Sequence, residues 1–195
     1  MKPKGKNKGK TRLTTQQQKL FDTLLFLAKL LVFAIPLYII MAFEGLLSPL
    51  QGLVTQNVRF MLQAMGFSVS GEGFLVIANA IIFFVSEDCT GWKSMLFLAA
   101  LIFSVPKVKM EKRLAGLALG LPAVYVGNLL RILLVVFAWH NYGLAFAMMI
   151  HTYFWQAGLI ALVLALWVSW LAWSGKMKIT LLKRSHKIIK PKVRK

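Results

Sequence analysis

The stretch LAGLALGLPAVYVGNLLRILLVVFA, residues 114–138, decides the class of fold, because it is an apolar run that contains one charged residue, Arg131. A helix rises about 1.5 Å per residue, so a run of this length crosses the roughly 30 Å hydrocarbon core of a membrane. Three further apolar segments occupy residues 20–43, 92–105 and 151–173. With 58% hydrophobic residues in a chain of 195, we predict an all-α integral membrane protein with about four transmembrane helices.

The distribution of positive charge predicts the orientation of these helices. The formal net charge is +18, and Lys or Arg cluster in residues 1–19, 107–113 and 176–195. Basic residues concentrate on the cytoplasmic side of a membrane, and four spans place all three clusters on that side. We therefore expect basic cytoplasmic tails at 1–19, which should be disordered, and at 176–195, around a domain at 20–175 embedded in the cell membrane. Nucleic acid is not an expected partner, because its binders place charge on a folded soluble face.

The segment between the first two spans is then extracytoplasmic. Between Gly45 and Gly66, apolar residues recur at steps of three and four, which predicts an amphipathic helix. Such a helix either lies on the outer membrane surface or packs within an extracytoplasmic cap. The turn signal Ser70-Gly71-Glu72-Gly73 predicts a short hairpin of residues 67–70 with 74–77, followed by an extended or helical continuation.

Several common chemistries have no motif in this chain. The sequence contains no GxxxxGKS, GxGxxG or HExxH pattern and no pair of cysteines. Nucleotide hydrolysis, dinucleotide chemistry and the common zinc sites are therefore disfavoured. We expect neither a cofactor nor a metal.

Cys89 is the only cysteine and lies in the stretch SEDCTG, residues 86–91, just before the second apolar segment. A single cysteine cannot form an internal disulfide, and many free cysteines are simply small buried hydrophobes. Arg131, in contrast, indicates a functional site, because a charge inside a membrane is costly to desolvate. His151 begins the fourth segment, although either it or His140 could serve only as an interfacial anchor.

Three of these residues are expected at one depth. Cys89 lies just outside the second span, Arg131 lies about 26 Å along a helix that enters from the cytoplasm, and His151 begins the fourth span from outside. A cation stabilises a nearby thiolate or a developing oxyanion, and an imidazole exchanges a proton near neutral pH. Asn128 is on the same helix face as Arg131 and can bind substrate or orient the guanidinium. The pattern predicts a thiol-nucleophile site on the extracytoplasmic side.

The acidic residues beside the cysteine oppose the formation of a thiolate if they point toward it. Glu87 and Asp88 immediately precede Cys89. We therefore expect at least one of the two carboxylates to face away or to pair with Lys93 or Arg131.

The stretch EDCTG at residues 87–91, the stretch NLLR at 128–131 and the later His151 resemble the exosortase/archaeosortase family over about residues 20–173. The resemblance implies a multi-span membrane enzyme, a cysteine peptidase or transpeptidase that cleaves C-terminal sorting signals of exported proteins. Such a signal consists of a short motif, a hydrophobic helix and a basic cluster. The partners implied are these exported proteins, with membrane lipids as a possible acceptor.

Carried over to this chain, the resemblance implies that Cys89 is the nucleophile and that Arg131 and His151 complete the catalytic set. Asn128, Glu87 and Thr90 are the expected substrate-binding or orienting residues. The chain departs from the family in two respects: it has fewer spans than many members, and Asp88 replaces the usual small residue before the cysteine.

Two other functions remain open on the sequence. In a small transporter or channel, Arg131 would line the pathway and Cys89 would be incidental. In a non-catalytic membrane scaffold, the basic tails would be the functional part.

Overall fold

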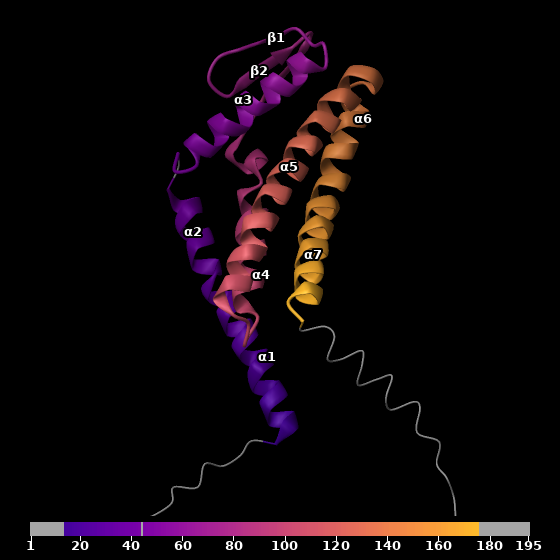
Figure 1. Ribbon diagram of the computed structural model, residues 1–195. Helices are drawn as coiled ribbons and strands as arrows, with labels where there is room; N and C mark the ends of the chain where they lie inside the picture. Colours follow the sequence, from indigo (N-terminus) through magenta and orange to yellow (C-terminus); the bar gives the residue numbers. More distant parts are fainter. Residues whose placement is uncertain (1–13, 44, 176–195) are drawn as a thin grey trace, which may run out of the picture.

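The structure, a computed structural model, describes residues 14–43 and 45–175 and consists of a helical bundle with a small cap at one end (Figure 1). Within these residues, three segments are long and apolar enough to cross a membrane: Gln16–Ala42, Met110–Tyr142 and Leu144–Trp173. A fourth, shorter apolar helix spans Trp92–Ser104. The predicted class of all-α membrane protein is therefore confirmed. The described chain begins and ends on the side opposite the cap.

The elements follow one another along the chain in a simple order. The first three helices are α1 (Thr15–Val32), α2 (Ala34–Ala42) and α3 (Ser48–Ala64). The strands β1 (Val69–Ser70), β2 (Leu75–Ala78) and β3 (Ile81–Phe84) lead into a 3₁₀ turn, Glu87–Thr90. Then come α4 (Trp92–Ser104), α5 (Met110–Tyr142), α6 (Leu144–Met149), a π-helical turn (Ile150–Phe154) and α7 (Trp155–Trp173).

The first apolar segment forms the single span predicted at 20–43, but it is built from two helices, α1 and α2. It begins early, at Thr15, because Thr14 and Gln17 form a capping box that satisfies free backbone N–H groups. It is interrupted at Phe33, three residues before Pro36. The break has a physical cause, since a proline ring clashes with the carbonyl four residues earlier and has no N–H to donate to it.

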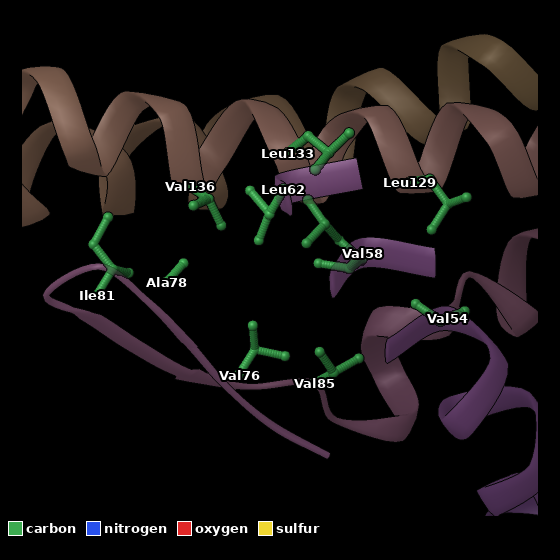
Figure 2. Close-up of a cluster of buried hydrophobic side chains, with 11 residues drawn as sticks. Val54, Val58, Leu62, Val76, Ala78, Ile81, Val85, Leu129, Leu133 and Val136 are labelled. Carbon is green, nitrogen blue, oxygen red and sulfur yellow. The ribbon is translucent and has the colours of Figure 1, made fainter. Parts of the chain in front are cut away.

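The cap is held together by an apolar core that joins α3 and the sheet to α5. Figure 2 shows this core, with side chains from all three parts pointing toward one another. The buried members are Val54, Val58, Leu62, Val76, Ala78, Ile81, Val85, Leu129, Ile132, Leu133 and Val136. Of the two alternatives for the amphipathic helix, packing within a cap is therefore the one observed.

The buried face of α3 also contains two polar side chains. Gln51 Nε2 donates a 2.6 Å hydrogen bond to the Val85 carbonyl, and Thr55 Oγ1 donates a 2.8 Å bond to the Gln51 carbonyl. Buried polar groups are stable only when bonded in this way. Gln51 thereby fixes the chain just before the 3₁₀ turn that carries Cys89.

The sheet has three antiparallel strands in the order β1-β2-β3. The pairing of Ser70 with Ile77 confirms the predicted hairpin around the glycine turn. The continuation toward Val85 is a third strand, which turns back through Asn79 and Ala80 and pairs Ala78 with Ile81. Asn79 has a φ of 54°, a conformation that two-residue hairpin turns require and that asparagine tolerates.

The end of the bundle opposite the cap is fixed by basic side chains. Lys107 Nζ lies 2.7 Å from Asp22 Oδ2, so this salt bridge joins α1 to the segment that follows α4. Arg113 donates to the carbonyls of Phe103 and Val105 at 3.2 and 2.7 Å. These bonds satisfy carbonyl groups that the end of α4 leaves free.

The last two long helices meet closely near the cap. Helix α5 has 33 residues and extends beyond the predicted span at both ends. Residues 140–150, between the third and fourth predicted spans, are almost entirely helical. The chain reverses at Gly143, whose φ of 84° suits glycine. The prediction that His151 begins the fourth helix is therefore wrong. His151 lies in the π-helical turn between α6 and α7.

Candidate functional site

Cys89 lies in the 3₁₀ turn that connects the sheet of the cap to α4. Its thiol is free and half-buried. Gly91 ends the turn with a φ of 79° and starts α4 at the next residue. A Cβ at Gly91 would lie 3.0 Å from Cγ of Asn128, so glycine serves both the backbone angle and the close approach of α5.

Ser86 is a neighbour of the thiol that the sequence prediction missed. Its Oγ donates a hydrogen bond to Cys89 Sγ over 3.3 Å. The three-residue spacing of Ser86 and Cys89 could have indicated this contact, because residues three apart in a 3₁₀ turn lie above one another. A hydroxyl that donates to sulfur stabilises the thiolate form relative to the thiol.

Asn128 links α5 to the cysteine turn. This fully buried side chain donates from Nδ2 to the Cys89 carbonyl over 2.7 Å, and its Oδ1 accepts from Arg131 Nη1 over 3.0 Å. The guanidinium of Arg131 also lies close enough to the Cys89 side chain for the two groups to interact. The predicted orienting role of Asn128 therefore has a structural basis, since one amide fixes both the cysteine backbone and the arginine.

His151 meets Arg131 from the other side. Its Nε2 lies 3.2 Å from Arg131 Nη2. Guanidinium N–H groups only donate, so Nε2 is the acceptor in this contact and the ring proton is on Nδ1. The imidazole thus orients the arginine in the state described by the structure.

A cavity of about 180 Å³ joins the three residues, and we call it the site cavity. Cys89, Arg131 and His151 line it from three separate elements. The rest of its lining is apolar and comes from β3, α5 and α6: Phe83, Phe84, Ile132, Val135, Val136, Trp139, Leu144, Ala147 and Met148. An apolar lining with a few convergent polar groups is typical of binding and catalytic sites.

The acidic neighbours of the cysteine make contacts outside the site cavity. Asp88 forms a 2.7 Å salt bridge with Lys93, which confirms the expectation that one carboxylate is paired. Glu87 accepts a 3.2 Å hydrogen bond from the backbone N–H of Gly45. The hydroxyl of buried Thr90 donates to the Glu87 carbonyl over 2.7 Å, so both residues stabilise the turn and do not line the cavity.

His140 was the alternative histidine, and it lies elsewhere. Its exposed ring packs edge-on against Phe67 with a centroid separation of 5.1 Å. It does not line the site cavity. The geometry therefore favours His151 over His140 as the imidazole beside the thiol.

The arrangement suits reactions in which negative charge develops near sulfur. A fixed cation in an apolar surrounding stabilises a thiolate or an oxyanion more than it would in water. An adjacent imidazole can accept and return a proton. Both groups are fixed by hydrogen bonds to neighbours on a rigid helix, which reduces the reorganisation needed during a reaction.

Comparison with known proteins addresses the same region of the chain. No curated protein and no solved structure matches it. Residues 11–171, however, match the family described as transmembrane exosortase (Exosortase_EpsH). This match covers the cap, every residue of the site cavity and all of the helices except the last two residues of α7. The chain therefore belongs to the transmembrane exosortase family.

Proposed function

We propose that the protein is a membrane-embedded cysteine peptidase or transpeptidase that removes C-terminal sorting tails from exported proteins. The observation that carries the proposal is the meeting of Cys89, Arg131 and His151 in one cavity. They come from a turn, a helix and a π-helical turn that are distant in sequence, in a chain of the exosortase family.

The first half of the proposed reaction forms a thioester. The contact between Arg131 and His151 opens, so that Nε2 of His151 accepts the Cys89 proton, and the thiolate is stabilised by Arg131 and by the hydroxyl of Ser86. The sulfur attacks a peptide carbonyl carbon, and the negative charge on the carbonyl oxygen is stabilised by the guanidinium. The carbon–nitrogen bond then breaks, and the leaving amine takes the proton from His151. The apolar helix and basic cluster of the substrate depart with that amine.

The second half regenerates the thiol. An amine or a water molecule attacks the thioester carbon and loses a proton to His151. The carbon–sulfur bond breaks, and the thiolate recovers that proton. A membrane lipid with an amine in its headgroup is the acceptor class that fits a site at the membrane boundary.

We further propose that the cap and the site cavity are extracytoplasmic. Four basic residues lie at the bundle end opposite the cap, in the connection between α4 and α5 and in the first turn of α5: Lys107, Lys109, Lys112 and Arg113. The positive-inside bias assigns such a cluster to the cytoplasm. The site then faces proteins that have already been exported.

The decisive experiment compares the wild type with Cys89→Ser in cells whose own gene has been deleted. Mass spectrometry of protein C-termini identifies exported proteins that keep an apolar, basic tail only in the serine variant. The serine hydroxyl is close in size to the thiol but far less ionised, so it tests reactivity rather than packing. Equal accumulation of both forms in the membrane is the required control. Identical tails in the two strains would exclude this function.

A further inference from the structure

Strand β3 is an edge strand, and its backbone bonding can be worked out from the register. It is last in the sheet order β1-β2-β3. The bond from Val85 N to Phe74 O, 3.0 Å long, identifies a hydrogen-bonded pair. Such pairs alternate along an antiparallel ladder. Ile82 and Phe84, opposite Ile77 and Leu75, therefore occupy the non-bonded pairs, and their N–H and C=O groups point away from β2.

This outward edge borders the site cavity. Phe83 and Phe84 line the cavity together with Cys89. The side chains of Ile82 and Phe84 are both 59% exposed. From Phe84 the chain passes directly through Val85 and Ser86 into the cysteine turn. The edge and the nucleophile are thus two parts of one continuous surface.

An unoccupied edge at this position is unfavourable. Within residues 14–43 and 45–175, no strand pairs with the outer side of β3. Exposed N–H and C=O groups on a sheet edge readily pair with another extended chain. Their desolvation beside an apolar cavity favours such pairing further, because an unsatisfied polar group costs several kcal/mol in a medium without water.

We propose that the substrate binds as an added strand along the outer edge of β3, which presents its scissile carbonyl to Cys89. This inference rests on the proposed function and names the mode of substrate recognition. The sheet belongs to the cap, and the apolar bundle lies on the other side of the cysteine turn (Figure 1). The added strand is therefore the motif that precedes the scissile bond, while the apolar tail of the substrate continues along the bundle.

Strand addition would let one site accept different peptide sequences and still prefer certain side chains. Backbone bonds to Ile82 and Phe84 supply affinity that does not depend on sequence, whereas alternate side chains supply specificity. Substrate side chains on one face of the added strand point into the site cavity, whose volume is about 180 Å³. The opposite set lies beside the exposed side chains of β3. The motif should therefore show a preference at every second position.

The first test removes a backbone donor from the edge. Ile82→Pro deletes one outward N–H, and its ring blocks close pairing, yet proline is tolerated on edge strands where the N–H is not used. We expect tail removal to fall by about tenfold or more, the upper range for a lost hydrogen bond. Membrane accumulation and the reaction of Cys89 with a small maleimide should match the wild type. Normal processing by Ile82→Pro would overturn the proposal.

The matched control places the same change on the opposite edge of the sheet. The bond from Asn79 N to Ser68 O, 2.9 Å long, makes the next pair, Val69 with Ala78, a non-bonded one. Val69→Pro therefore also removes an outward N–H, but Val69 does not line the site cavity. Processing by Val69→Pro should stay within about twofold of the wild type, as expected when no hydrogen bond is lost. An equal loss in both variants would overturn the assignment to β3.

A second test acts on the substrate and is independent of how the variants fold. The comparison of wild type with Cys89→Ser defines a cleavage junction, and a synthetic peptide across it is N-methylated at one position at a time. Purified full-length protein should lose cleavage at alternate positions only. Uniform tolerance would overturn strand addition. Failure to cleave even the unmethylated peptide in a Cys89-dependent way would instead reject the proposed function.

The competing occupant of the edge is a second copy of this chain. Ile82→Cys, made in the Cys89→Ser background, would then form a disulfide-linked dimer under mild oxidation. We expect a monomer. Dimer formation in membranes at native expression would assign the edge to self-association and overturn the proposal.

Discussion

Asn128 binds the main chain of Cys89 and not its sulfur: its Nδ2 lies 2.7 Å from the Cys89 carbonyl oxygen. The same side chain accepts from Arg131 over 3.0 Å. This bond does not involve the sulfur, so in the proposed reaction it can hold the turn in place while the sulfur gains and loses an acyl group. We therefore propose that Asn128 positions both Cys89 and Arg131.

Two replacements of Asn128 remove different sets of its hydrogen bonds. Asn128→Asp keeps an acceptor for Arg131 but cannot donate to the Cys89 carbonyl, whereas Asn128→Leu loses both. A buried acceptor without a donor costs about 1–3 kcal/mol, so both variants should accumulate less and process tails more slowly. The measurement is tail removal per molecule of membrane protein. Wild-type rates for Asn128→Leu would contradict the positioning role.

Arg131 should not tolerate lysine. Its guanidinium contacts Asn128 and His151 from two nitrogens and also interacts with Cys89. An ammonium is a point charge and cannot reproduce this fork. We expect Arg131→Lys to lower processing by about a hundredfold or more, the loss typical of an oxyanion-stabilising donor. Degradation of the variant in place of slow processing would indicate a structural role only.

The two histidines should behave differently. His151 lines the site cavity and contacts Arg131, whereas exposed His140 packs on Phe67. His151→Ala should reduce processing by about a hundredfold, the lower range for a lost general acid–base. His140→Ala should be nearly silent at matched expression. The reverse pattern would assign proton transfer to His140.

Ser86 should make a smaller contribution. Its hydroxyl donates one hydrogen bond to Cys89 Sγ. Ser86→Ala should slow the reaction of Cys89 with iodoacetamide and tail removal to a similar extent, about two- to tenfold for one hydrogen bond. Ser86→Thr retains the donor and serves as the control. If alkylation is unchanged while processing falls, the hydroxyl acts on the substrate and not on the thiol.

The orientation in the membrane should follow the basic cluster. Reporter domains fused at Arg113 and at Gly71 should report the cytoplasm and the exterior, respectively, because the two positions lie at opposite ends of the bundle. Reporter activity in the cytoplasm from the Gly71 fusion would reverse the assignment and place the site cavity on the inner side.

The sequence was most informative where a boundary has a chemical cause. Helix α4 begins at Trp92, as predicted, because Gly91 adopts a left-handed conformation before it. It ends at Ser104, within one residue of the prediction, as expected ahead of Pro106. The expectation that Cys89, Arg131 and His151 lie at one depth rested on the fixed rise per residue of a helix, and the three residues line one cavity.

Other features depend on backbone geometry that apolar patterns do not encode. Strand β3 lies in a run of apolar residues with no clear period, and its turn at Asn79 is not one of the common glycine pairs. The bond from Ser86 to the thiol exists only because residues 87–90 form a 3₁₀ turn. The π-helical turn at His151 contains an extra residue, and a single inserted residue is not visible in the helical periodicity of the apolar residues.

That π-helical turn, Ile150–Phe154, has a consequence for how the family can diverge. A turn of this kind arises from one inserted residue, which rotates the following helix by about 100° without changing its own pattern. Helix α7 can therefore keep Leu159, Val163 and Trp170 buried, whichever residue the turn presents to Arg131. A substitution within the turn therefore changes the group beside Arg131 while the packing of α7 stays intact, whereas deletion of the extra residue would rotate α7 and disturb that packing.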